Sequence, residues 1–325
     1  MAPGTGCRTV INAMRICSFV PGATEIVAAI GLGDSLVGRS HECDYPPELA
    51  SVPALTRSTL QPASNSSADI DGAVRTRVAS GLPLSTVDVT ALAAAAPDLV
   101  ITQELCHVCG ITPSHIQDAG PLYHRTPRQL ASSPSCLEDI LTDVARIGDA
   151  VDARESAARL VEDLRARREA VRHKSALHEA PPRVICLEWL DPFYTAGHWI
   201  PEMVALAGGR EVLGQAGAPS HRVEWNDLEN SRPDILILMP CGFSALQAGE
   251  EYARMHSRWP WDVLPAVQSG RVFAVDANAY FSRPGPRLFR GLEILADLFT
   301  TSSLASTPPG SQRCAMHRRQ IELEP

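Results

Sequence analysis

Residues 15–33 read RICSFVPGATEIVAAIGLG, and this segment indicates the architecture of the chain. Its first six residues form a short apolar run typical of a strand. Pro-Gly then turns the chain into an apolar helix that ends at Gly31 and Gly33. A related pattern returns in the second half, where an apolar strand at 183–187 precedes a helix at 201–207 that begins with proline and is followed by two glycines. The chain therefore repeats one strand-and-helix unit.

Each half also carries a second apolar run that follows a Pro-Asp pair, at 97–101 and at 233–237. Apolar runs of about five residues that alternate with helices are typical of parallel strands buried on both faces. A chain of 325 residues is long enough to form two domains. We therefore expect an α/β fold with two Rossmann-like lobes, each built on a parallel sheet.

The expected parts of the chain are an N-terminal extension at 1–13, an N-terminal lobe at 14–150, a linking helix at 151–178, a C-terminal lobe at 179–300 and a disordered tail at 301–325. The first lobe is longer than the second, and its additional residues fall in a Pro/Ser/Ala-rich insertion at about 46–83. The linking segment has one apolar stripe, charged residues elsewhere and no Gly or Pro in its centre, which predicts a single rigid helix. The tail lacks periodicity.

Charge and composition exclude several partners. The formal net charge of −8 argues against nucleic acid and anionic membranes, because both require clustered Lys and Arg. No apolar run approaches the roughly 18 residues that a membrane span needs. Residues 1–14 lack the apolar core of about 7–15 residues that marks a secretory signal. Nine cysteines, an odd number, favour free or ligating thiols over a disulfide framework. We therefore expect a cytoplasmic protein.

The two halves differ in chemistry. Fourteen of the 17 aromatic residues lie between Pro182 and Thr300, whereas the first half carries Cys, His and Glu in two short runs, 41–45 and 103–109. If the halves face each other, one wall of the cleft is aromatic and the other offers soft donors. Such a cleft suits a large, flat, metal-containing ligand, because its faces need stacking and its edges need hydrogen bonds.

In open parallel sheets, ligands bind outside the carboxyl ends of the strands. The loops that follow the apolar runs are rich in aromatic, Cys, His or carboxylate residues; they span 41–45, 103–109, 189–199, 241–243 and 278–281. From these loops the candidate ligand-binding residues include Tyr45, Glu104, Cys106, His107 and His198.

Four residues also have the donors of a tetrahedral zinc site: His41, Cys43, Cys106 and Cys109. A metal-dependent or redox protein built on them is the competing hypothesis, with iron as the other metal. The alternative is that the thiols are half-buried loop residues without a metal. His41 or His107 is also able to ligate the metal of a bound cofactor, although a loop histidine is more often a hydrogen-bonding surface group. No phosphate loop, Gly-x-Ser-x-Gly elbow or His-Glu-x-x-His motif is present, so we expect no catalysis.

Several segments resemble, in order and spacing, the substrate-binding proteins of cobalamin and ferric-siderophore importers, which share the class III periplasmic-binding-protein fold. They are SFVPGATE (18–25), VGRS (37–40), DYPP (44–47), PDLV (97–100), FYTAG (193–197), RPDI (232–235) and SRPGPR (282–287). The resemblance covers about residues 14–300 and is greatest to the cobalamin-binding branch. It implies two lobes bridged by one long helix, with the ligand in the cleft and little closure on binding. By this resemblance the ligand lies near His41, Glu42, Cys43, Trp189, Phe193, Trp199 and Phe281.

The chain departs from that family at two positions. Members that dock on an importer present an exposed Glu on each lobe, whereas this chain has Thr90 and Ala205 at the corresponding places. Together with the missing export signal, this departure favours an intracellular corrinoid-binding protein over delivery to a transporter. The expected protein partner is a transporter or a cobalamin-handling protein.

We therefore expect binding of cobalamin or a related corrinoid in the inter-lobe cleft. The alternative ligands are haem and a ferric siderophore. An anionic siderophore requires several converging basic groups, for which the sequence offers Arg39, Arg57, Arg222, Arg283 and Arg287.

Overall fold

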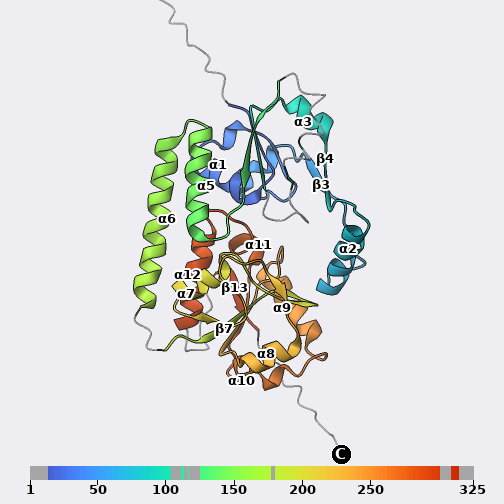
Figure 1. Ribbon diagram of the computed structural model, residues 1–325, viewed down its shortest axis with the longest axis vertical. Coiled ribbons are helices and arrows are strands. Elements are labelled where there is room, and N and C mark those ends of the chain that lie inside the picture. The colour runs from blue at the N-terminus through green and yellow to red at the C-terminus, as the bar shows by residue number, and fades with distance from the viewer. Residues whose placement is uncertain are drawn as a thin grey trace, which may run out of the picture.

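The computed structural model describes residues 14–103, 111–112, 116, 125–176, 180–300 and 309–314. Two α/β lobes are stacked along the long axis of the molecule, with the sheet of each lobe beside helices (Figure 1). The expectation of a two-lobe α/β fold is confirmed. Among the described helices, none is long and apolar enough to cross a membrane.

The N-terminal lobe is built on a four-stranded parallel sheet. Its strands, in sheet order, are β2 (Leu36–Arg39), β1 (Ile16–Ser18), β5 (Leu99–Gln103) and β6 (Arg128–Ser132). The helical segments of this lobe are α1 (Pro21–Ala29), η1 (Gly33–Ser35), η2 (Pro47–Ser51), α3 (Val89–Ala95) and α5 (Leu137–Ala150). All three residues of the central strand β1 are buried, as expected for a strand covered on both faces.

The C-terminal lobe has a larger, mixed sheet. Its strands, in sheet order, are β10 (His221–Arg222), β8 (Phe193–Thr195), β7 (Arg183–Leu190), β11 (Ile235–Leu238), β12 (Val272–Val275) and β13 (Ser311–Arg313), and β9 (Arg210–Glu211) also pairs with β7. Its helical segments are α7 (Ile200–Leu206), α8 (Trp225–Ser231), α9 (Ala245–Met255), η4 (Trp261–Val263), α10 (Pro265–Gln268), α11 (Ala277–Tyr280) and α12 (Leu288–Thr300).

The expectation of a parallel sheet is wrong for three strands of this lobe. β8 and β10 run antiparallel to their neighbours, and so does β13. Only two residues separate β7 from β8, and a connection that short allows antiparallel pairing but no crossover.

The expectation of a disordered tail is wrong for residues 309–314. Within this segment β13 pairs with β12, and Arg313 lies opposite Phe273. Without β13, the apolar strand β12 would be an edge with unpaired backbone groups, which neighbouring segments commonly cover.

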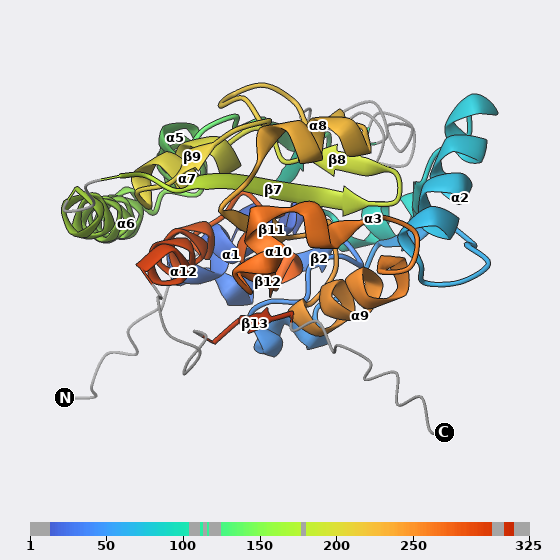
Figure 2. The same ribbon diagram turned by 90° about the horizontal axis from the view of Figure 1, so that it is seen from below.

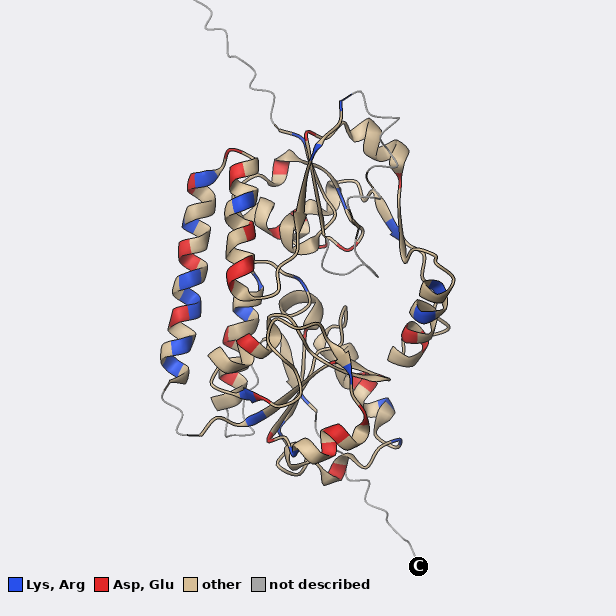
Figure 3. Cartoon of the chain, in the orientation of Figure 1, with Lys and Arg blue, Asp and Glu red and all other residues tan. Residues whose placement is uncertain are grey.

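The linking helix is α6 (Arg154–Ser175), which lies within the range expected for it. It packs against α5 of the N-terminal lobe and against α7 and α12 of the C-terminal lobe. Charged residues of both signs alternate along its length (Figure 3). Ion pairs connect α6 to both lobes: Arg168 Nη1 lies 2.8 Å from Glu138 of α5, and Arg167 Nε lies 2.7 Å from Glu293 of α12. The helix therefore holds the lobes in a defined arrangement.

The largest of three apolar core clusters of the described residues runs through both lobes beneath this helix. It joins buried residues of β1, α1 and α5 to buried residues of β7, α7 and α12; Ile16, Leu141, Val184, Met203 and Leu295 are examples. The lobes are thus not two bodies on a flexible hinge. Their inner helices share buried apolar area, which stabilises one fixed relative placement.

The insertion extends from the N-terminal lobe to the C-terminal lobe. Its ends, β3 (Thr56–Ser58) and β4 (Ser85–Val87), form an antiparallel pair beside the N-terminal lobe. Between them the chain reaches the C-terminal lobe and returns as α2 (Ser67–Ala79). Figures 1 and 2 both place α2 at the edge of the molecule opposite α6.

Candidate functional site

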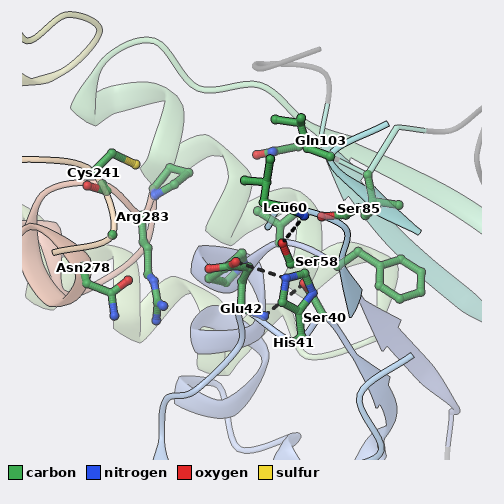
Figure 4. A pocket seen from close by; sticks show the side chains of 18 residues that line it. Ser40, His41, Glu42, Ser58, Leu60, Ser85, Gln103, Cys241, Asn278 and Arg283 are labelled. Atoms are coloured by element: carbon green, nitrogen blue, oxygen red, sulfur yellow. Dashed lines mark hydrogen bonds and ion pairs between the residues drawn. The ribbon is translucent and has the colours of Figure 1, made fainter. Parts of the chain in front are cut away.

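A cavity of about 280 Å³, here named the cleft cavity, lies between the two lobes. The N-terminal lobe contributes His41, Glu42 and Ser85 to its lining, and the C-terminal lobe contributes Cys241 and Asn278. Figure 4 shows these two groups of side chains on opposite sides of the cavity.

The topology of both sheets creates this cavity. In the N-terminal lobe, β1 leads to Phe19, β2 leads to Ser40, and β5 ends at Gln103; all three residues line the cavity. In the C-terminal lobe, the loop after β11 supplies Cys241, and the turn of helix after β12 supplies Asn278. Both lobes thus present the carboxyl ends of parallel strands to one space, the usual position of a ligand in α/β sheets.

His41 is held in one orientation by Thr56. Its backbone N–H donates to Thr56 Oγ1 at 2.9 Å, and its Nδ1 lies 2.7 Å from the same oxygen. Thr56 donates its single hydroxyl hydrogen to Ser40 Oγ at 3.1 Å. With that hydrogen directed to Ser40, Nδ1 is the donor toward Thr56, and Nε2 is the ring nitrogen that faces Glu42.

Glu42 lies next to that nitrogen. Its Oε1 is 3.2 Å from His41 Nε2, and its side chain is 60% exposed. The neighbouring His41 holds the pKa of the Glu42 carboxyl below its usual range, against the opposing effect of burial. At neutral pH the cavity therefore has a carboxylate that is free to turn toward solvent and uncover the imidazole.

Ionic contacts join the lobes at one side of the cavity. Arg283 pairs through both terminal nitrogens with Asp44, which also accepts a hydrogen bond of 3.3 Å from Asn278. Burial raises the pKa of Asp44, but the hydrogen bonds from Arg283 outweigh it, so the pKa lies below its usual range. Arg287 donates to buried Glu25 at 2.6 Å. The DYPP and SRPGPR segments, distant in sequence, are therefore in contact.

Of the expected ligand-binding residues, His41 and Glu42 line the cleft cavity. Cys43 does not, because its side chain is buried and lies 3.0 Å from Thr24 Oγ1. Tyr45 is exposed under the guanidinium of Arg287, 4.0 Å from the ring centroid, and is not among the lining residues.

Phe193, which was expected near the ligand, lies instead in the core of the C-terminal lobe. Phe193 is buried against Trp225, Trp259 and Trp261, with ring centroids 5.5–6.3 Å apart. These rings fill the core of the C-terminal lobe, where edge-to-face packing adds to the burial of a large apolar area.

The segment around Trp199 also packs inward. Trp199 is buried and its Nε1 donates to the carbonyl of Phe281 at 2.8 Å; Phe281 is buried as well. The His198 ring lies tilted against the Trp199 ring, and burial lowers the pKa of His198. None of these three side chains lines the cavity, so they support the fold and do not contact the ligand space.

Trp189 lines a second cavity of about 590 Å³, here named the strap cavity. It lies between α2 and the C-terminal lobe and shares Leu84 and Cys241 with the cleft cavity, so the two spaces adjoin. The sequence-based list of candidates missed the α2 side of this cavity. The pattern in the sequence that could have predicted these lining residues is the four-residue spacing of Ile70, Val74 and Val78, within the segment interpreted as an insertion.

The zinc hypothesis finds no support in the described residues. Glu104, Cys106, His107 and Cys109 lie outside them. Burial raises the pKa of the Cys43 thiol to about 11, so at neutral pH it is protonated and a poor metal ligand. Within the described ranges, no three His, Cys, Asp or Glu residues are grouped in a way that could hold a metal ion.

Two α/β lobes that share a cavity and are joined by one long helix are the architecture of a two-lobed binding protein. Residues 16–279 match the family model described as periplasmic binding protein, and the chain belongs to this family. It is thus a substrate-binding protein, a class without catalytic activity.

Named relatives span nearly the whole chain. The vitamin B12-binding protein of Vibrio parahaemolyticus is 24% identical over 279 residues, 86% of each chain. Among solved structures, the periplasmic vitamin B12 binding protein BtuF of Vibrio cholerae is 23% identical with a TM-score of 0.63 and covers 88% of this chain and 96% of its own. A periplasmic heme binding protein from Pseudomonas aeruginosa is 18% identical with a TM-score of 0.69, covering 93% and 98%.

These findings correct the expected location. The prediction of a cytoplasmic protein is wrong, because the family and its solved members are periplasmic or lipoprotein substrate-binding proteins. The prediction relied on residues 1–14, which lie outside the range that matches the family model, residues 16–279. The expectation of intracellular handling in place of import is wrong for the same reason. Thr90 and Ala205 are exposed on α3 and α7, so the lobes present uncharged side chains there.

Proposed function

We propose that this substrate-binding protein holds a corrinoid, cobalamin or a close relative, in the space between its lobes. One observation carries the proposal: the described lining of the two adjoining cavities combines apolar side chains, neutral hydrogen-bonding groups and the carboxyl groups of Glu42, Asp71 and Glu188, and its Arg side chains are already paired. The rim of a corrin carries neutral amides, which suit such a lining.

The polar groups match an amide rim. The cleft cavity is lined by hydroxyls and amides that both donate and accept hydrogen bonds: Ser40, Ser58, Ser85, Gln103, Asn278 and Ser282. Serine and amide side chains can satisfy corrin amides without burying an unpaired charge, which would be costly in a partly closed cavity.

Charge pairing distinguishes a corrinoid from haem. Haem carries two carboxylates, which would require cations where they are buried. The described lining of the two cavities contains Arg283 and Arg75 as its Arg and Lys residues. Arg283 pairs with Asp44, and Arg75 Nε lies 2.7 Å from Asp71. Binding of haem would have to break one of these pairs, whereas binding of a corrinoid would not.

The basic residues that the sequence offered to a siderophore do not converge on the cavity. Arg39 donates to the carbonyls of Leu49 and Val52, Arg222 pairs with Glu224, and Arg287 pairs with Glu25. Arg57 is not among the lining residues. An anionic siderophore is therefore disfavoured.

His41 is the group we assign to the metal of the ligand. Its Nδ1–H is engaged by Thr56, so Nε2 is the nitrogen that can donate a lone pair to cobalt. Glu42 has to turn aside for this contact, and its exposed position permits that movement.

Titration of the purified protein with hydroxocobalamin, cobinamide and haemin tests the proposal. We expect tighter binding of the corrinoids than of haemin, and a shift of the visible spectrum of hydroxocobalamin on binding. The His41→Ala variant should keep binding but lose the shift. His221→Ala, which removes an exposed histidine of β10 outside both cavities, should behave like the unchanged protein.

Two outcomes would contradict these expectations separately. Preference for haemin over both corrinoids overturns the corrinoid assignment. Binding of hydroxocobalamin with an unchanged spectrum overturns ligation by His41 and leaves the assignment of the ligand class intact.

A further inference from the structure

The first turn of α2 is anchored to the C-terminal lobe. The backbone N–H of Ser67 donates to Glu251 Oε1 at 2.9 Å, and the Ser67 hydroxyl donates to the same oxygen. Trp189 Nε1 donates to the Ser67 carbonyl at 3.1 Å. Glu251 is only 2% exposed and its other oxygen accepts from Arg254 at 2.9 Å. A buried, fully paired carboxylate therefore holds the helix that begins at Ser67.

The rest of α2 is less buried than this first turn. Ser67 is its only buried residue, although the helix has an apolar face. Ile70, Val74 and Val78 recur at four-residue spacing, which places them on one face, and all three line the strap cavity. Val78 is 49% exposed. Val74 and Val78 are thus turned toward an open space, whereas Ile70 also packs against the core of the C-terminal lobe.

The opposite wall of that space is aromatic. Trp189 and Tyr194 of the C-terminal lobe line the strap cavity across from the α2 face. An aliphatic wall facing aromatic rings suits a broad apolar surface, because ring stacking and burial of aliphatic groups both favour such a surface.

The volumes of the two cavities indicate that one ligand occupies both. The cleft cavity alone, at about 280 Å³, lies just below the range of roughly 300–1,000 Å³ typical of small-molecule sites. The strap cavity of about 590 Å³ adjoins it through Leu84 and Cys241. A tetrapyrrole in the cleft would therefore extend beneath α2.

We propose that α2 is a strap that forms one wall of the ligand site. Ile70, Val74 and Val78 cover one face of the bound tetrapyrrole, and the Glu251 anchor keeps the strap in place across the cleft. This inference rests on the proposed function and assigns specificity to a segment of the chain that the sequence marked only as an insertion.

A matched pair of substitutions tests the strap. Val74→Asp introduces a charge into the apolar wall, whereas Val263→Asp makes the same change at a residue of η4 that is 42% exposed and lines neither cavity. We expect Val74→Asp to weaken binding of hydroxocobalamin at least tenfold and Val263→Asp to leave it unchanged. Thermal unfolding of both variants shows whether they fold; if Val74→Asp does not, Val74→Thr should weaken binding several-fold.

The outcomes separate this inference from the function on which it rests. If the unchanged protein binds a corrinoid and the Val74 variants bind it equally well, α2 is not a wall of the site, and the inference falls while the proposed function stands. If the unchanged protein binds neither corrinoid nor haemin, the proposed function falls. The dye ANS then probes the apolar wall: weaker fluorescence enhancement with Val74→Asp than with Val263→Asp supports it, and equal enhancement overturns it.

Discussion

Gly22 lies at a point where the two lobes touch. A Cβ atom added to Gly22 would be 2.1 Å from the carbonyl oxygen of Pro284, and this neighbour is backbone that cannot rotate away. Gly22 is the second residue of α1 in the N-terminal lobe, and Pro284 precedes α12 of the C-terminal lobe. The absence of a side chain at Gly22 therefore allows the lobes to approach closely.

Gly22→Ala should lower the free energy of unfolding by about 1–3 kcal/mol, because a methyl group forced into a packed contact shifts the backbone. Gly72→Ala is the matched control: it lies within α2 and has no atom within 4 Å of its added Cβ. Alanine at that position should be neutral or stabilise by up to about 1 kcal/mol, since it favours helix. Urea unfolding of the two variants measures both effects, and equal stabilities would contradict the close contact at Gly22.

At the scale of one element, the anchoring of α2 depends on the ionised form of Glu251. Burial raises the pKa of this carboxyl, but hydrogen bonds from Ser67 and Arg254 outweigh it and hold the pKa below its usual range. A lowered pKa in the folded protein means that the stabilisation is complete above the unfolded pKa and is lost as the pH falls through the folded value. The contribution of Glu251 to anchoring the strap is therefore complete at neutral pH and weakens in acid.

Glu251→Ala should raise the rate of hydrogen exchange of the α2 amides at least tenfold at neutral pH and leave the amides of β11 protected. The variant loses the acceptor of the Ser67 N–H at the start of the helix. Glu250→Ala changes the exposed neighbour on the same helix and should have no effect. Equal exchange in both variants would show that Glu251 does not anchor the strap.

At the scale of the whole molecule, the apolar core shared by β1, α5, β7 and α12 makes the two lobes one cooperative unit. α6 adds ion pairs to both sides, and α2 connects the lobes at the opposite edge. With both edges bridged, ligand binding should require little relative movement of the lobes.

Urea unfolding should therefore show one transition by two independent probes. All five tryptophans lie between residues 189 and 261 and report on the C-terminal lobe, whereas circular dichroism at 222 nm reports on helices of both lobes, including α1 and α5. We expect the two curves to coincide. A tryptophan transition separated from the circular-dichroism transition would contradict a shared core.

The sequence alone determined the strand-and-helix units, the two-lobe α/β architecture and the loops around His41. These features follow from local signals, because apolar runs, turn residues and helix ends depend on neighbours a few positions away. His41 and Glu42 could be predicted as lining residues, since they follow β2 at its carboxyl end.

Only the tertiary structure decided which face each side chain presents. Phe193 and Trp199 belong to aromatic-rich loops, yet they pack into the core because other rings and backbone carbonyls lie within reach there. The pairing of β13 with β12 and the reach of α2 to Glu251 join residues far apart along the chain. Such contacts leave no local pattern in the sequence, because burial is set by what the folded chain brings together and not by the type of residue.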